Sequence, residues 1–175
     1  MSHIALNTYR AAEKALCEPD LKQALYDEGA LLMDRVLVTL HGEEHRQRRV
    51  LEMRVFRRDF FRRYEHEIIP DIFEETVATF KEKGSADVVD FGYRVMVYLA
   101  VAFAGVDRQD KSAEEFETLL RLLKVFGKAA TLGQAKGDRE AAKQEIRDGL
   151  AEFDERFVTP SIERRKELIA KVEAG

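Results

Sequence analysis

Apolar residues recur along most of the chain at the three- and four-residue spacing that is typical of amphipathic helices. The stretch 113–132 shows this spacing most clearly, and residues 70–83 and 139–158 carry similar apolar stripes. Residues 9–17 and the charged stretch 42–56 also have helical spacing. The pattern therefore predicts an all-α fold. The side chains expected to be buried in the three clearest helices are Ile72, Phe73, Val77, Phe80, Phe116, Leu119, Leu120, Leu123, Phe126, Ala130, Ile146, Leu150, Phe153 and Phe157.

Prolines indicate where several of these helices begin or end. Pro19 is expected to stop the first helix, and Pro70 fits the first turn of another. Pro160 is expected to kink or restart the last helix, which then continues to residue 172. Residues 31–40, which are rich in Leu and Val, are compatible with an extended segment.

The stretch 91–106 is apolar on nearly every side, with Arg94 as its interruption. A helix of this kind must be covered on most sides by other parts of the protein. The other predicted helices offer single apolar stripes, which are too narrow to surround it. We therefore expect the chain to lack some packing partners of this helix.

The composition is ordinary for a globular protein, with 45% hydrophobic and 35% charged residues among 175. This length allows one domain or part of a larger one. The single Cys excludes an internal disulfide and a multi-Cys zinc finger, and it favours a reducing compartment. The first ten residues lack the apolar core of a signal peptide, and no apolar stretch is long enough to span a membrane. We therefore expect a cytoplasmic protein without a membrane span.

The charge is unevenly distributed around a net value of -4. Eight Arg lie between Arg46 and Arg63, against only Glu52 and Asp59, so this Arg-rich band has an excess of six positive charges. Such a band indicates an anionic partner, and one interpretation is a stand-alone helical binding module that uses it. Nucleic acid is not the expected partner, because the chain is acidic overall and the band has no interleaved exposed aromatic residues. The simpler interpretation is a solvated helix face.

The sequence His41-Gly42-Glu43-Glu44-His45 matches the spacing H-x-x-E-H of some zinc hydrolases. On a helix this spacing places two imidazoles on one face, with Glu44 as the general base. However, Gly42 lies where a helix is more easily started than continued, and a zinc hydrolase needs a third ligand. The motif therefore stays a minor alternative.

His45 and Arg49 are one helical turn apart, so they share a face and can hold one anionic group of a ligand. The surrounding segment, HGEEHRQRRVLEMRVF, resembles the C-helix region of the cytochrome P-450 family, the haem-thiolate monooxygenases. Gly42, Glu44 and Phe56 also stand at the places of that pattern. The resemblance implies that His45 and Arg49 contact a propionate of the haem cofactor.

The resemblance extends along nearly the whole chain and implies a single partial domain, residues 1–175. In order, residues 9–26 resemble the B helix, 42–56 the C helix, 70–83 the D helix, 87–106 the E helix, 113–132 the F helix and 139–172 the G helix. The chain lacks the family's F-x-x-G-x-x-x-C-x-G loop, because its one Cys, Cys17, lies in LCEPD. The oxygen-activating helix and the N-terminal sheet have no counterpart either. The chain therefore resembles the B-to-G section of such an enzyme and contains no catalytic residues of its own.

A complete enzyme of this family inserts one oxygen atom from O2 into an apolar organic substrate, and haem iron carries that chemistry. By resemblance, this section supplies the propionate contact, part of the substrate lid and part of the electron-donor surface, while the chain alone is inactive. Its implied partners are a ferredoxin- or flavin-type electron donor and the missing C-terminal part of the enzyme. The arginines expected to face the donor are Arg54, Arg57, Arg58, Arg62 and Arg63.

Overall fold

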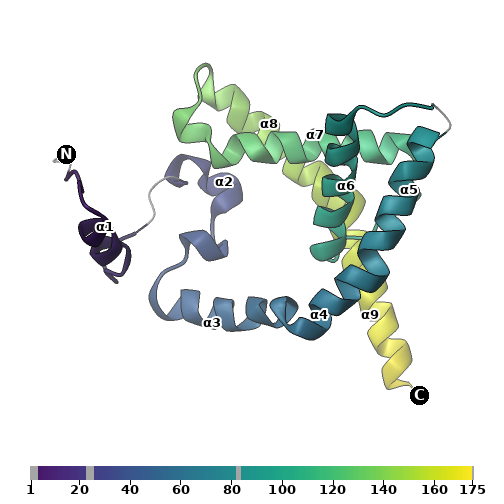
Figure 1. Ribbon diagram of the computed structural model, residues 1–175, viewed down its shortest axis with the longest axis horizontal. Helices are drawn as coiled ribbons and strands as arrows, with labels where there is room; N and C mark the ends of the chain where they lie inside the picture. The colour runs from purple at the N-terminus through teal and green to yellow at the C-terminus, as the bar shows by residue number, and fades with distance from the viewer. Residues whose placement is uncertain (1–3, 23–25, 82–83, 175) are drawn as a thin grey trace.

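Every regular element in the computed structural model is helical within the residues that the structure describes, 4–22, 26–81 and 84–174 (Figure 1). The predicted all-α class is therefore confirmed for these ranges, and no strand occurs in them. The ends of two predicted helices, at residues 23–26 and 82–83, fall wholly or partly outside the described residues. The α-helices are α1 (Tyr9–Leu16), α2 (Ala30–Met33), α3 (Gly42–Glu52), α4 (Arg58–Arg63), α5 (Ile69–Lys81), α6 (Val88–Phe103), α7 (Ala113–Ala130), α8 (Arg139–Phe153) and α9 (Thr159–Glu173).

Side-chain hydrogen bonds cap the N-termini of three of the longer helices, α6, α7 and α8. The Asp87 carboxylate accepts hydrogen bonds from two backbone N–H groups in the first turn of α6, and Asp138 does the same for α8. The Ser112 hydroxyl accepts one from the Glu115 N–H at the start of α7. Such caps satisfy N–H groups that have no partner within the helix, so these starts are encoded locally.

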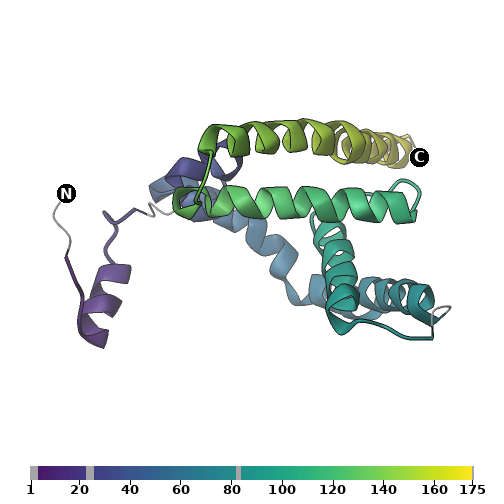
Figure 2. The ribbon, with the colours of Figure 1, turned by 90° about the horizontal axis from the view of Figure 1, so that it is seen from above.

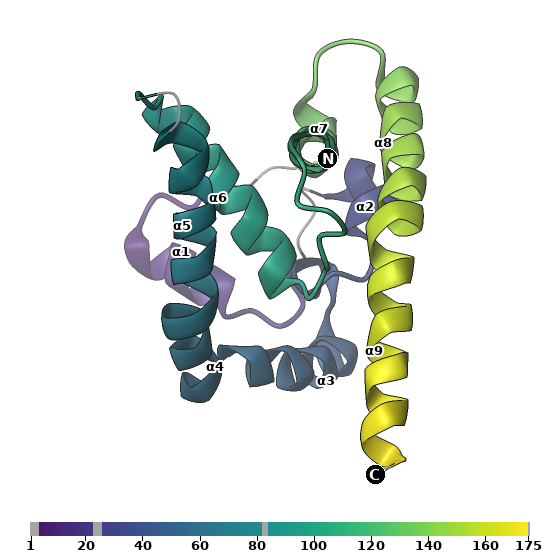
Figure 3. The same cartoon turned by 90° about the vertical axis from the view of Figure 1, so that its right-hand side faces the viewer.

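Each of the two prolines within helices follows a π turn. The turns are Tyr64–Ile68, before Pro70, and Asp154–Val158, before Pro160. Proline has no N–H and crowds the carbonyl four residues earlier, and the wider turn accommodates both effects without ending the helix. Pro70 lies in the first turn of α5, as the sequence predicts, and the π turn before it joins α5 to α4 in one helical run from Arg58. Similarly, α8 and α9 form one continuous column (Figure 3).

The core lies where α6 packs between α5, α7 and the α8–α9 column. Its most deeply buried side chains are Phe116, Leu119, Leu122 and Phe157, each at most 1% exposed. Helices α7 and α8 lie side by side, and α2 packs against the same end of the pair (Figure 2).

The approach of α2 to α7 is close because a glycine lies at the contact. A Cβ atom on Gly29 would lie 2.1 Å from the carbonyl oxygen of Ala129, so a larger residue would push the two segments apart. The stretch 31–40 is not extended. It forms α2 and a 3₁₀ turn, Leu37–Thr39.

Helix α6 is covered on only one face. Val95, Val97, Tyr98 and Val101 are buried, whereas Met96 is 63% exposed, and Tyr93 and Phe103 are also exposed. The whole chain has 13348 Å² of accessible surface. A compact monomer of this mass exposes about 8,700 Å², so much apolar surface here has no cover.

Helix α1 contributes part of that surface. None of its residues is buried, and it lies apart from the body of the molecule (Figure 1). Among the described helices, none is long and apolar enough to cross a membrane.

Candidate functional site

His45 and Arg49 line the same cleft on the surface of α3. His41 precedes the helix in an extended conformation, and Gly42 begins it with a φ of 59°, a value that favours glycine. The cleft has a volume of about 560 Å³. Its other lining residues are Leu21, Leu37, Val38, Leu40, His41 and Gly42. The structure therefore brings the two predicted residues together beside an apolar wall.

Arg49 differs from its arginine neighbours in lacking a carboxylate partner. Arg46 pairs with Glu43 at 2.7 Å, and Arg48 pairs with Glu52 at 2.6 Å. No ion pair or side-chain hydrogen bond engages Arg49 or His45 within residues 4–22, 26–81 and 84–174. The Arg49 guanidinium is therefore available to a carboxylate ligand that enters the cleft.

The zinc alternative finds no support in the geometry around Glu44. Its carboxylate is paired with Arg35 at 2.8 Å. His41 lies outside the helix that carries His45, because the backbone of His41 is extended. In the described part of the chain, no three His, Cys, Asp or Glu side chains gather in the manner of a metal site.

The five arginines of the predicted donor surface lie on the 3₁₀ turn Met53–Phe56, on α4 and between them, and all are exposed. Arg57 pairs with Asp59 at 3.4 Å, and Arg63 pairs with Glu67 at 3.3 Å. The other three, Arg54, Arg58 and Arg62, have no carboxylate partner among the residues described.

The expectation that the Arg-rich band lacks exposed aromatic residues is wrong. Phe56 and Phe61 are 59% and 53% exposed, and Phe60 is also exposed. The sequence suggested burial for such side chains, but no element of the described chain covers this side of α4. Two of these rings line an apolar groove of about 490 Å³, together with Val55, Tyr64, Glu65, Ile69 and Phe103. Sequence analysis missed this groove, although the pairs Val55-Phe56 and Phe60-Phe61 were a visible signal.

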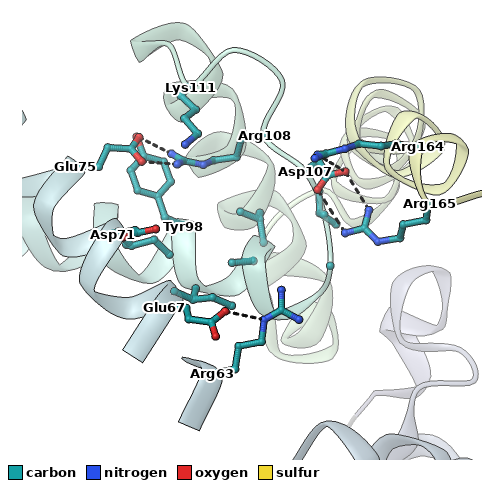
Figure 4. A pocket seen from close by; sticks show the side chains of 16 residues that line it. Arg63, Glu67, Asp71, Glu75, Tyr98, Asp107, Arg108, Lys111, Arg164 and Arg165 are labelled. Carbon is teal, nitrogen blue, oxygen red and sulfur yellow. Dashed lines mark hydrogen bonds and ion pairs between the residues drawn. The ribbon is translucent and has the colours of Figure 1, made fainter. Parts of the chain in front are cut away.

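A second, polar cleft of about 560 Å³ lies between α5, the end of α6 and α9 (Figure 4). On its α5 side, Arg108 donates hydrogen bonds from two nitrogens to the Glu75 carboxylate, one of them 2.8 Å long. Burial raises the pKa of the Tyr98 hydroxyl, and the opposing effect of the nearby Arg108 charge is smaller.

On its α9 side, the Asp107 carboxylate pairs with Arg165 at 3.0 Å and with Arg164 at 3.2 Å (Figure 4). The Asp107 backbone N–H also donates to the Ser161 hydroxyl at 2.8 Å. Most charges in this cleft are thus paired with each other. They tie the loop after α6 to α5 and α9, which supports a structural role for the cleft.

The chain matches no protein-family model, and comparisons with curated proteins and with solved structures also found no match.

Proposed function

We propose that the chain is the B-to-G section of a haem-dependent monooxygenase, located in the cytoplasm, whose complete form inserts one oxygen atom from O2 into an apolar organic substrate. The observation that carries the proposal is the pair His45 and Arg49. They line one cleft, and the Arg49 guanidinium has no partner in the described chain. A cation and an imidazole one turn apart suit a haem propionate, because charge-assisted hydrogen bonds to a carboxylate are strong.

The surface of the chain gives independent support for its being a section. Its accessible surface exceeds that of a compact monomer of equal mass by about 4,600 Å². Helix α6 is half-covered, and α3 has no buried residue at all. Both helices are therefore suited to packing against further polypeptide.

The residues present fit the propionates of haem, but the sequence does not contain the thiolate loop of the family. Cys17 is exposed beside α1, in a sequence unlike the thiolate loop of the family. In this proposal haem iron supplies the oxygen chemistry, and the chain's own residues bind and orient the cofactor. The thiolate and the remaining core must come from the missing C-terminal part.

The exposed arginines Arg54, Arg57, Arg58, Arg62 and Arg63 are the proposed contact with an acidic ferredoxin- or flavin-type donor. The alternative proposal is a stand-alone helical module that binds an anionic partner. The arginines Arg54, Arg58 and Arg62 support this alternative as much as they support a donor surface, because they have no carboxylate partner within the described ranges.

Sequencing of the DNA beside the coding region tests the two proposals. We expect a continuing or adjacent reading frame that encodes F-x-x-G-x-x-x-C-x-G. The joined protein should bind haem and, once reduced and exposed to carbon monoxide, show a thiolate-type Soret shift. A flanking sequence without that motif, from an organism whose genome has no separate frame for it, would leave the binding module as the better proposal.

A further inference from the structure

The cleft beside α3, which His45 and Arg49 line, combines an apolar wall with basic side chains. Its polar side chains are two imidazoles and one guanidinium, and no acidic residue occurs among the described residues that line it. Its apolar side chains are those of Leu21, Leu37, Val38 and Leu40. The two clefts described above differ in this respect, because Glu65 lines the apolar groove and four acidic side chains line the polar cleft. The cleft beside α3 is therefore suited to an anionic ligand with an apolar body.

The acidic side chains of α3 do not neutralise this cleft. No ion pair engages Arg49 within residues 4–22, 26–81 and 84–174, although three acidic residues share its helix. None of the three lines the cleft, and each pairs with another arginine. They are Glu43, Glu44 and Glu52, which pair with Arg46, Arg35 and Arg48 at 2.7, 2.8 and 2.6 Å. A ligand carboxylate would therefore meet an unpaired guanidinium and no competing acid.

The first turn of α3 adds a further preference for an anion. Gly42 begins the helix and lines the cleft, and the side chain of the N-cap residue, His41, makes no capping hydrogen bond. Backbone N–H groups without helical partners give this end of a helix a partial positive charge. This charge lies at the same cleft as the Arg49 guanidinium and has the same sign.

The positions of the basic and apolar groups indicate the shape of the ligand. His45 and Arg49 are one turn apart on one face of α3, so a single carboxylate can accept hydrogen bonds from both. The apolar wall comes mainly from the 3₁₀ turn Leu37–Thr39 and from Leu40, just before the helix. The cleft volume of about 560 Å³ lies within the range of small-molecule pockets. One carboxylate at the end of an alkyl chain matches this arrangement.

We propose that the cleft beside α3 binds a medium-chain fatty acid. The carboxylate accepts hydrogen bonds from Arg49 and His45, and the alkyl chain packs against Leu37, Val38 and Leu40. This inference concerns the chain by itself. It goes beyond the monooxygenase proposal and requires neither haem nor a further section of polypeptide.

The test is isothermal titration calorimetry of the full chain without haem. The probes are decanoate, decanol and decylammonium, which share one alkyl chain and differ in the charge of the head group, all used below the concentration of micelle formation. We expect decanoate to bind about tenfold or more tightly than either of the other two. Added NaCl should weaken the binding of decanoate and leave that of decanol almost unchanged.

Variants of two neighbouring arginines separate a specific contact from general charge. Arg49→Ala should lose about tenfold or more in affinity for decanoate, and Arg49→Lys should lose less because lysine keeps the charge. Arg48→Ala is the matched control. It removes the same charge from the next position of α3, where the guanidinium already pairs with Glu52, and should bind decanoate almost as the parent does.

Variants of apolar residues locate the alkyl chain. Val38→Ser should weaken the binding of decanoate by about threefold or more, because Val38 is part of the apolar wall. Phe56→Ser changes the apolar groove instead and should bind as the parent does, since Glu65 makes that groove unfavourable for an anion. Both side chains are exposed, so helical circular dichroism should be retained in both variants.

Several results would overturn the proposal. They are absence of decanoate binding, equal affinities for the three probes, equal losses in Arg49→Ala and Arg48→Ala, and a larger loss in Phe56→Ser than in Val38→Ser. The last of these would assign the alkyl chain to the apolar groove. The monooxygenase proposal is tested by the flanking DNA, so the failure of either proposal can be recognised without the other.

Discussion

Arg108 lies over the ring of Tyr98, with its guanidinium carbon 3.9 Å from the ring centroid. The same guanidinium binds the Glu75 carboxylate through two nitrogens, and only 10% of the Arg108 side chain is exposed. Three elements, α5, α6 and the loop before α7, are joined by this one side chain. It therefore holds the polar cleft together.

We expect Arg108→Lys to lower the free energy of unfolding by about 2–3 kcal/mol, because lysine keeps the charge but loses the second hydrogen bond and the planar contact with Tyr98. Urea unfolding followed by circular dichroism measures the change. The control is Arg58→Lys at an exposed position, which should change stability by less than about 0.5 kcal/mol. Similar losses in both variants would contradict the role given to Arg108.

Glu115 should be equally important for the loop between α6 and α7. The residue is only 3% exposed, and its carboxylate accepts hydrogen bonds from the backbone N–H groups of Gln109, Asp110 and Lys111. Glu115→Gln replaces one acceptor oxygen by a donor, so we expect a loss of about 1–3 kcal/mol in thermal or urea unfolding. Glu114→Gln is the matched control, because Glu114 occupies the same helix turn but is exposed. A loss in the Glu114 variant as large as in the Glu115 variant would refute this account.

The raised pKa of Tyr98 predicts a stability change in alkali. The folded state keeps the hydroxyl protonated to a higher pH than the unfolded state does. The contribution of this hydroxyl to the free energy of unfolding is therefore fully present below the pKa of an unfolded Tyr, about 10. It declines as the pH rises from there through the higher pKa of the folded state. Urea unfolding of the parent, of Tyr98→Phe and of Tyr93→Phe on both sides of this pH measures the effect. The decline should be smaller in Tyr98→Phe, and a parent-like decline in that variant would contradict the prediction.

Loss of Arg49 should weaken haem retention in a complete enzyme that carries this segment. A charge-assisted hydrogen bond contributes about 1.5–3 kcal/mol, so Arg49→Ala should accelerate haem transfer to an apoglobin acceptor by about one to two orders of magnitude. Arg48→Ala is the control, because Arg48 already pairs with Glu52 and lies on a different side of α3. Equal transfer rates for the two variants would remove Arg49 from the haem site.

The chain by itself should show no thiolate-ligated haem. When the purified chain is mixed with haem, reduced and exposed to carbon monoxide, we expect no thiolate-type Soret shift, because the sequence lacks the thiolate loop. Cys17→Ala serves as the control. A shift in the parent chain that disappears in this variant would show that exposed Cys17 can act as the ligand.

The sequence by itself determined the helices and the contacts made within them. The apolar spacing of α7 predicted its range almost to the residue, and the shared face of His45 and Arg49 followed from their separation of one turn. Only partners three or four residues apart matter to these features, so a linear pattern is sufficient. Pro70 lies in the first turn of α5, as predicted, but no spacing rule indicates the π turn that joins α5 to α4.

Only the tertiary structure decided which side chains meet across the chain and which stay uncovered. Arg108 and Glu75 are 33 residues apart, and Asp107 and Arg165 are 58 apart. The groove joins residues 55–69 to Phe103. Phe56 and Phe61 are exposed because no element of the described chain packs over them. Burial and long-range ion pairing depend on how the helices pack in three dimensions, and the residues that decide this packing lie far apart in the sequence.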